Sequence, residues 1–375
     1  MKKIQLVHVL SNLSTGGAQV LLFDLIEHLQ AMGGYEQSVI AFKGGGYHEK
    51  FSSLGIPVHI IKPTFFLYDP IFIYRFIQTL LDQKPDCIHS VLWAANFLSR
   101  SASYWYSIPL VQSLHNNLDQ NGKIRSFLDR ISSFHRTQIV AVSDGIARSL
   151  VTHAPWLKKS PLVVIKNGIE VKQIRKNAQT HAVPRSALGL GDAHFVIGSV
   201  GRFEAVKNYA LLLTTFALLY DTHSEARLVL VGYGSQENFL KKRAFDLGIA
   251  DRVVFVIQQP GYAYYHLFDC FVLSSYGEGI SMALLEAMSL GCPAVVTSPD
   301  VVHDVITHEQ NGLLVPLADA QLLAGAIDRY IKDKNFASHC GQQGLKTVQE
   351  FFTSFAMAEK YAYLYQRVVS RSAKN

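Results

Sequence analysis

The chain has 375 residues, of which 49% are hydrophobic and 17% charged, so it is globular and too long for one core, and two domains are expected. No stretch reaches the roughly 18 apolar residues of a membrane span, because the nearest candidate, residues 65–81, is interrupted by Asp69, Pro70 and Arg75. The net charge of +6 suits phosphate ligands or an anionic membrane surface, and the lack of an interleaved aromatic and basic motif argues against nucleic acid.

In the first half, short apolar runs alternate with amphipathic stretches. Strands are expected at residues 4–10, 37–42, 58–61, 86–91, 109–114 and 138–143. Between the first two, residues 18–32 carry apolar side chains at helical spacing. Nearly continuous apolar strands separated by helices indicate a parallel sheet covered on both faces. Residues 1–170 are therefore expected to form one α/β domain.

The polar, basic stretch 170–194 reads as a linker, after which the alternation resumes in a second α/β domain at residues 190–354. Its strands are expected at residues 194–200, 227–232, 252–257, 270–275, 293–298 and 312–316. A last helix, at about 355–375, is expected to pack back on the first domain. Two such domains imply a cleft between them, which is where ligand pockets concentrate.

Three loops follow predicted strands and precede helices, where backbone amides can hold an anion. In the first loop, Gly16 and Gly17 allow close approach of a phosphate, although a plain turn is the alternative. This loop matches neither a dinucleotide fingerprint nor a P-loop, which argues against a nicotinamide enzyme. In the second, Gly201 clears space while Arg202 and Lys207 could clamp a diphosphate. The alternative is a pair of solvated surface cations.

The third loop leads into a helix that contains the second of two glutamates. The amides of Gly279, Ile280 and Ser281 would face a ligand at the positive end of this helix. Glu286 would lie about 8 Å along the axis from Ser281, and Glu278 on the order of 10 Å from Glu286. That spacing is long for a glycosidase pair but suits two ends of one ligand, a ribose and a sugar, with a diphosphate between them. The alternative is a helix-start charge and a surface glutamate.

The stretch "EGISMALLE" (278–286) resembles the Glu-x7-Glu motif of retaining glycosyltransferases of family 4, and "GRFEAVKN" (201–208) is similar to their diphosphate loop. Further similar segments occur in the family's order: "STGGAQ" (14–19), "SLHNN" (113–117), "VVIKNGIE" (163–170), "LVLVGYGS" (228–235), "FDCFVLSS" (268–275) and "NGLLVP" (311–316). The resemblance covers most of the chain and is strongest over residues 195–316.

The resemblance implies a GT-B fold, with two Rossmann-like, doubly wound parallel-sheet domains facing across a cleft. The donor would be a nucleotide diphosphate sugar, with UDP favoured, and no metal or other cofactor is implied. Glu286 would hold the ribose, Glu278 the donor sugar, and Arg202 with Lys207 the departing diphosphate. Amides near Gly17 and at Ile280 and Ser281 would assist, and His115 would contact the sugar or lend a hydrogen bond to the departing phosphate.

Some positions depart from the family pattern, and these concern the nucleobase more than the chemistry. Ser274 stands where relatives often have proline, Gln258 where many have glycine, and residues 299–301 lack a glycine turn.

The acceptor implied by the resemblance is a glycan or a lipid-linked sugar in cell-surface polysaccharide biosynthesis. A basic amphipathic helix expected at residues 122–136 could lie on an anionic membrane, or it could be an ordinary surface helix packed on the sheet. The four cysteines show no metal spacing or pairing, and the N-terminus lacks a secretory pattern. A cytoplasmic protein, peripheral on the inner face of the membrane, is therefore expected.

Two other classes of function remain open. One is a GT-B epimerase or phosphorylase, although a phosphorylase would need a pyridoxal-bearing lysine or a second phosphate pocket. The other is a two-lobed binder of sugars or nucleotides that performs no chemistry and would need no such set of acids and cations.

Overall fold

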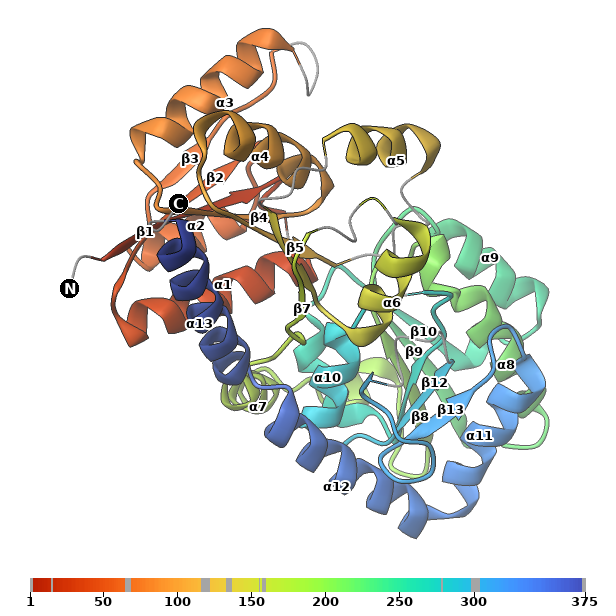
Figure 1. Ribbon diagram of the computed structural model, residues 1–375. Helices are drawn as coiled ribbons and strands as arrows, with labels where there is room; N and C mark the ends of the chain where they lie inside the picture. Colours follow the sequence, from red (N-terminus) through yellow and green to blue (C-terminus); the bar gives the residue numbers. More distant parts are fainter. Residues whose placement is uncertain are drawn as a thin grey trace. The chain divides into compact units, whose positions relative to one another are not determined.

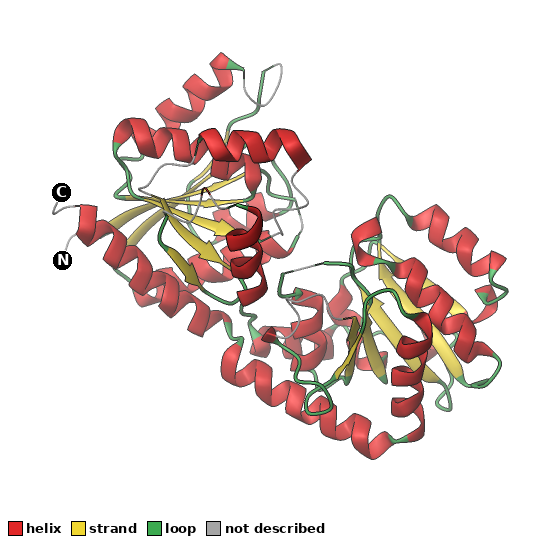
Figure 2. Ribbon diagram, turned by 45° about the vertical axis from the view of Figure 1, so that its right-hand side comes forward, coloured by secondary structure: helices red, strands yellow, loops and turns green. Residues whose placement is uncertain are grey.

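The computed structural model describes residues 3–14, 16–64, 69–115, 122–132, 137–154, 156, 160–277, 279–297 and 304–372, the side chains of 122–124 excepted. The chain divides into two units, Met1–Gly168 with Ser354–Asn375, and Ile169–Thr353. Each unit is built on its own parallel sheet, with helices on both faces (Figure 2).

The first unit contains a seven-stranded sheet in the order β3-β2-β1-β4-β5-β6-β7. Its strands are β1 (Ile4–Leu10), β2 (Tyr35–Ala41), β3 (Val58–Ile60), β4 (Cys87–Val91), β5 (Leu110–Leu114), β6 (Thr137–Ala141) and β7 (Leu162–Val164). Its helices are α1 (Gly17–Met32), α2 (Tyr47–Ser53), α3 (Pro70–Asp82), α4 (Trp93–Tyr106), α5 (Gly122–Ile131), α6 (Asp144–His153) and α13 (Ser354–Ser372). The last helix, α13, lies beside α1 (Figure 1).

The second unit contains a six-stranded sheet in the order β10-β9-β8-β11-β12-β13. Its strands are β8 (Phe195–Val200), β9 (Ala226–Gly232), β10 (Val253–Ile257), β11 (Cys270–Leu273), β12 (Ala294–Thr297) and β13 (Leu313–Val315). Its helices are α7 (Val171–Thr180), α8 (Tyr209–Tyr220), α9 (Glu237–Asp246), α10 (Met282–Ser289), α11 (Ala320–Lys332) and α12 (Lys334–Phe351). Short 3-10 turns connect them: η3 (Arg185–Leu188), η4 (Ala205–Lys207), η5 (Ala250–Arg252), η6 (Gly261–Ala263) and η7 (Tyr265–Leu267).

The strands of the second sheet are buried on both faces. Along β9, Val229 and Val231 belong to one hydrophobic cluster, whereas Leu228 and Leu230 belong to another. Successive side chains of a strand point to opposite faces, so each face of this sheet has its own core. The expected fold class, two α/β units with parallel sheets, is confirmed.

The structure corrects the expectation of a linker over residues 170–194. Helix α7 occupies Val171–Thr180 and belongs to the second unit. Val171 and Leu190 contribute to the core of that unit, and Arg175 Nε donates a hydrogen bond to the Ser289 carbonyl at the end of α10 (3.2 Å). This polar helix has only two buried residues, too few for a clear helical period.

The remaining helices are close to their expected positions. The helix expected at 122–136 is α5, which ends at Ile131, and residues 133–136 lie outside the described part. The four cysteines are all buried and none forms a disulfide. Among the described residues, no helix combines the length and the apolar character that crossing a membrane requires.

Candidate functional site

The carboxyl ends of β8 and β9 carry two loops whose backbones touch. A Cβ on Gly232 would lie 1.9 Å from the Gly201 carbonyl oxygen, and one on Gly234 would lie 2.6 Å from that of Phe203. The Phe203 amide donates to the Tyr233 carbonyl (2.7 Å). Only glycine permits such close contact, so these residues fix the shape of the cation-bearing loop 201–208.

Both predicted cations are on this loop. Arg202 is exposed, and Lys207 ends the turn η4 and is half-buried. A Cβ on Gly201 would lie 3.7 Å from Lys207 Nζ, so the absence of a side chain at Gly201 leaves room for the ammonium group beside the end of β8. The loop thus presents positive charge at the strand end, where parallel sheets bind ligands.

The cation loop is tied to the loop that precedes α10. Ser274 Oγ lies 3.0 Å from the Lys207 carbonyl oxygen and 3.1 Å from that of Asn208, and it can donate to either. The Tyr276 amide donates to the Val206 carbonyl (2.9 Å). A proline at position 274 could not form the hydroxyl bonds. Glu278 itself lies outside the described residues.

Helix α10 begins at Met282, after Gly279, Ile280 and Ser281, and ends before Gly291, whose φ is 77°. Ser281 occupies the N-cap position, but its side chain forms no capping hydrogen bond. The amides of the first turn of a helix have no intrahelical acceptor, so this end can accept an anion. The predicted helix and its glycine stop are confirmed.

Glu286 lies in the middle of α10 and is half-buried. Its Oε2 accepts a hydrogen bond from the hydroxyl of Tyr265 (2.8 Å), whose side chain is 1% exposed. Burial raises the pKa of Glu286 to about 7, and the tyrosine hydroxyl, which favours the charged form, opposes this. Glu286 is therefore not the solvated surface glutamate of the alternative interpretation.

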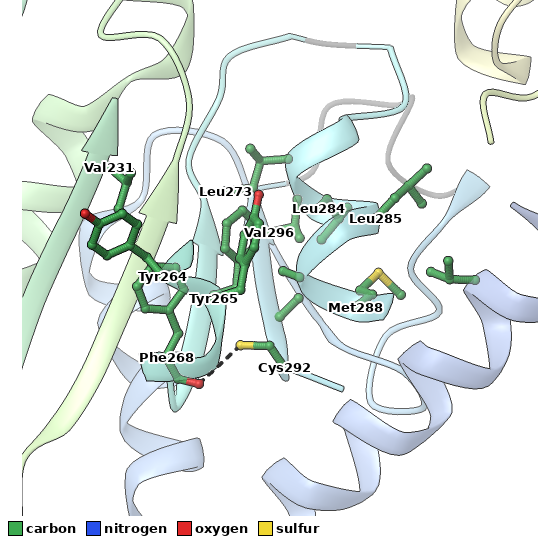
Figure 3. Packing of buried hydrophobic residues seen from close by; sticks show 14 of the residues in the cluster. Val231, Tyr264, Tyr265, Phe268, Leu273, Leu284, Leu285, Met288, Cys292 and Val296 are labelled. Carbon is green, nitrogen blue, oxygen red and sulfur yellow. Dashed lines mark hydrogen bonds between the residues drawn. The ribbon is translucent and has the colours of Figure 1, made fainter. Parts of the chain in front are cut away.

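Tyr265 is held by aromatic packing. Its ring meets those of Phe268 and Phe271 at centroid distances of 5.9 and 6.0 Å. In Figure 3, Tyr265 lies in the same cluster as Leu284 and Leu285, the two residues of α10 that precede Glu286.

Tyr265 also connects Glu286 to the end of β8. A Cβ on Gly261 would lie 3.6 Å from the Tyr265 hydroxyl and 2.5 Å from Val200 Cγ1, at the last residue of β8. Gly201 follows directly. Glu286 and the cation loop therefore lie around one strand end, although their residues are about eighty positions apart in the sequence.

In the first unit, the glycine loop leads directly into α1. A Cβ on Gly16 would lie 2.7 Å from Oε1 of Gln19, a buried side chain that donates to the Asn12 carbonyl (3.1 Å). Gly17 is the first residue of α1, so its amide is at the positive end of that helix. Gly45 also abuts this loop, since its Cβ would lie 2.2 Å from the Leu13 carbonyl oxygen.

His115 follows β5 and is half-buried. It lines a small pocket with His89, Ser113, Asn167 and Tyr361. Burial lowers the pKa of His115 to about 4, so the imidazole is neutral near pH 7 and can give or accept a hydrogen bond without carrying charge.

The structure therefore groups Gly201, Arg202, Lys207 and Glu286 around one strand end of the second unit, while Gly16, Gly17 and His115 lie in the first unit. Sequence reasoning missed Tyr265. A tyrosine in a short turn carries no periodic signal, and only its contact with Glu286 reveals it.

Two family models match the sequence. The model described as Glycosyltransferase Family 4 matches residues 15–173, and the one described as Glycosyl transferases group 1 matches residues 184–347. An uncharacterized glycosyltransferase of Methanocaldococcus jannaschii is 25% identical over 298 residues, which cover 76% of this chain and 75% of the relative. The lipopolysaccharide core biosynthesis glycosyltransferase LpsE of Rhizobium meliloti is 29% identical over 244 residues, 64% of this chain and 68% of the relative.

Solved structures are also similar. That of Anabaena HepE in complex with UDP-glucose aligns with a TM-score of 0.85 at 19% identity, and the alignment covers 96% of this chain and 99% of that one. At this identity the likeness shows the fold, which is the GT-B fold.

Proposed function

We propose that this chain, which belongs to the family 4 type of glycosyltransferases, transfers a hexose-type sugar with retention from a UDP-sugar to a glycan or lipid-linked acceptor. The observation that carries the proposal is the grouping of Glu286, Gly201 and Lys207 around the end of β8. A site for a diphosphate can be built without a metal ion, because two cations and a helix N-terminus can neutralise the negative charge of the phosphates. UDP is supported by the UDP-glucose bound in the similar Anabaena structure.

Each residue has a distinct task in this proposal. Above pH 7, where Glu286 is mostly ionised, it accepts two hydrogen bonds from the ribose hydroxyls, because only a charged carboxylate is an acceptor on both oxygens. Arg202 and Lys207 stabilise the negative charge that grows on the diphosphate as the bond to the sugar breaks. Glu278 holds hydroxyls of the donor sugar, and the amides of Gly17, Ile280 and Ser281 add dipoles. Neutral His115 donates to or accepts from the sugar.

The first test is a thermal-shift screen with nucleoside diphosphates and their sugars, followed by measurement of donor hydrolysis without a metal ion and with a chelator. A ligand that binds only the folded protein raises its melting temperature. We expect UDP to do so and the chelator to have no effect. Folded protein that neither binds nor hydrolyses any nucleotide sugar would contradict the proposal, and an epimerised donor would reveal an epimerase.

Lys207→Ala should reduce kcat of donor hydrolysis by about 100-fold, the usual effect of losing one group that stabilises transition-state charge. Lys241→Ala is the matched control, because Lys241 lies in the same unit and its salt bridge with Glu237 is on the exposed surface of α9. Equal activity of the two variants would remove Lys207 from the reaction.

We also propose that α5 contacts an anionic membrane from the cytoplasmic side. Phe127 and Ile131 are 62% and 56% exposed, and Arg125 and Arg130 on the same helix are exposed too. Asp129 is buried, pairs with Arg100 and accepts from Trp93 Nε1 (3.1 Å), so it anchors the other side of α5. The apolar side chains of this helix therefore do not all pack on the sheet, and cations beside apolar groups suit anionic lipid.

The membrane contact is tested by co-sedimentation with vesicles made with and without anionic lipid. We expect binding only to the anionic vesicles, and Phe127→Ser with Ile131→Ser should abolish it without a change in donor hydrolysis. Unchanged sedimentation of the double variant would refute this role of α5. The similarity to the lipopolysaccharide core biosynthesis glycosyltransferase LpsE supports an acceptor that belongs to the cell surface. An enzyme bound to the membrane would lie close to such an acceptor.

A further inference from the structure

A row of hydrogen-bonded, buried polar side chains, called the relay below, crosses the sheet of the first unit from β2 to α13. Gln37 Oε1 lies 3.1 Å from His8 Nε2, and the two Nδ1 atoms of His8 and His89 are 3.1 Å apart. His89 Nε2 lies 2.8 Å from Ser113 Oγ, which lies 2.7 Å from the hydroxyl of Tyr361. All five side chains are less than a tenth exposed. The strands β2, β1, β4 and β5 are consecutive neighbours, so the relay spans them in order.

The positions of the protons in this row of side chains can be assigned by starting from Gln37. The amide nitrogen of Gln37 donates to the Ile26 carbonyl (3.1 Å), so its oxygen faces His8. His8 Nε2 must therefore carry hydrogen. A neutral imidazole then has a lone pair on Nδ1, so Nδ1 of His8 accepts and Nδ1 of His89 must donate. Burial lowers the pKa of His8 to about 4 and that of His89 further below its usual range, which keeps both rings neutral.

Each further proton position, as far as Tyr361, then follows from the one before it. Because His89 is protonated on Nδ1, its Nε2 is an acceptor and the Ser113 hydroxyl donates to it. The Ser113 oxygen then accepts from the Tyr361 hydroxyl. Since the proton of Tyr361 is committed to Ser113, its oxygen can offer only lone pairs to other groups.

The relay ends at the pocket beside His115. Ser113, His89 and Tyr361 line that pocket together with His115, which is the first residue after β5. The pocket has room for about one water molecule, and its lining combines these polar groups with apolar side chains of α1 such as Leu21 and Leu25. A water there would need the polar groups as its hydrogen-bond partners. Such a water can donate to the Tyr361 oxygen and hydrogen-bond to His115.

We propose that Gln37, His8, His89, Ser113 and Tyr361 form a one-way hydrogen-bond relay that fixes two histidine tautomers and presents an acceptor oxygen to a water beside His115. Ser113 and Tyr361 are then positioning residues, which hold the imidazole of His115 in one orientation through that water. The positioning role rests on the function proposed above for His115, whereas the relay does not.

The relay is tested without reference to activity by nitrogen-15 spectra of the histidine side chains in the full chain. His8→Asn and His89→Asn identify the two sets of signals by their loss. We expect His8 protonated at Nε2 and His89 protonated at Nδ1, which is the less common form of a free neutral imidazole. His89 protonated at Nε2 instead would overturn the assignment of the whole relay.

The positioning role is tested by Tyr361→Phe with a matched control, Tyr365→Phe. Tyr365 is four residues further along α13, is fully buried, and its hydroxyl has no hydrogen-bond partner among the described residues. The same oxygen atom is thus removed from the same helix in both variants. Tyr361→Phe should shift the side-chain signals of His115 and lower kcat of donor hydrolysis about 5- to 10-fold, as expected for one lost hydrogen bond. Its KM for the donor should change less than about twofold.

Ser113→Ala should reproduce these changes, because it breaks the relay one step earlier, and it serves if Tyr361→Phe folds poorly. Wild-type His115 signals and kcat in Tyr361→Phe, or equal losses in Tyr365→Phe, would overturn the positioning role. If the wild-type protein hydrolyses no nucleotide sugar, the proposed function fails, but the spectra still decide whether the relay exists and whether it orients His115.

Discussion

The hydrogen bond from Tyr265 helps to set the pH range over which the carboxylate of Glu286 is charged. Burial disfavours its charge and the hydroxyl of Tyr265 favours it, and the balance of the two raises the pKa of Glu286 to about 7. Tyr265 occupies Oε2, and within the described part of the chain no hydrogen bond is made to Oε1. We infer that Tyr265 orients the carboxylate toward a diol and lowers the pH at which Glu286 becomes charged.

Tyr265→Phe should weaken UDP binding about tenfold at pH 7 and less at pH 8.5. Without the hydroxyl, the pKa of Glu286 rises above 7, so at pH 7 more of the carboxyl is protonated and loses an acceptor. Isothermal titration across pH 6–9 measures this. Tyr264→Phe is the control, because Tyr264 is 6% exposed and its pKa rises through burial alone. A pH profile of Tyr265→Phe that overlays the wild-type profile would refute the role of Tyr265.

The sequence indicated some of these residues and not others, for physical reasons. Glu286 could be predicted because it stands at a fixed distance from a helix start that Gly279 and Gly291 mark. Tyr265 and the relay could not, because their contacts join different strands and turns, as between His8 and His89, which are 81 residues apart. Local spacing carries no information about such contacts.

Among the elements, α10 depends on its close packing with α12. A Cβ on Gly341 of α12 would lie 2.1 Å from the Gly291 carbonyl oxygen at the end of α10, and Gly344 faces Met288 of α10 at 3.3 Å. The backbone of Gly291 is held in place, because its amide donates to the Met288 carbonyl (2.9 Å) and the next amide, that of Cys292, donates to the Ala287 carbonyl (3.1 Å). The glycines of α12 therefore set the position of α10 and, with it, of Glu286.

Gly341→Ala should lower the free energy of unfolding by about 2–4 kcal/mol, since the methyl group must displace backbone. Gly325→Ala is the opposite case. Gly325 lies inside α11 and its Cβ would meet nothing within 4 Å, so alanine should stabilise by about 0.5–1 kcal/mol. Urea unfolding of both variants tests the pair, and destabilisation of similar size in both would show that the contact with Gly291 is unimportant.

Periodicity predicted the buried strands of both sheets within one or two residues, because a parallel strand buried on both faces is a continuous apolar run. It missed β7, an edge strand of only three residues whose first residue, Leu162, is 40% exposed. It also missed α7, which has Val171 and Ala178 as its only buried residues. Helices and strands that bury few side chains show no clear hydrophobic period in the sequence.

Across the whole molecule, the two units should respond to acid in opposite directions. In the first unit, the pKa values of His8 and His115 are lowered to about 4. Below about pH 6.5 the unfolded chain therefore binds protons at these histidines that the folded unit does not bind. Its stability therefore falls between pH 6.5 and 4. In the second unit, Glu286 binds its proton near pH 7 when folded and near 4.5 when unfolded, so that unit gains stability as pH falls from 7 to 4.5.

The three tryptophans, Trp93, Trp105 and Trp156, all lie in the first unit, so their fluorescence reports that unit alone. Between pH 7.5 and 5 the fluorescence melting temperature should fall by several degrees, while far-UV circular dichroism should show a second transition that does not fall. The contribution of His8 alone at pH 4 is on the order of 3 kcal/mol. Coincident transitions that move together would contradict independent responses, and Glu286→Gln should flatten the response of the second transition.

The return of α13 to the first unit has a consequence for how the protein is made. Tyr361 and Tyr365 cover His89, and the Tyr35 hydroxyl donates to the Ala362 carbonyl, so one side of the first sheet is covered by residues synthesised after the whole second unit. At about 5–20 residues per second, a ribosome needs roughly 10–40 s to add everything after Gly168. During that interval the nascent sheet has an uncovered apolar surface, and it should be a client of chaperones that bind chains still under translation.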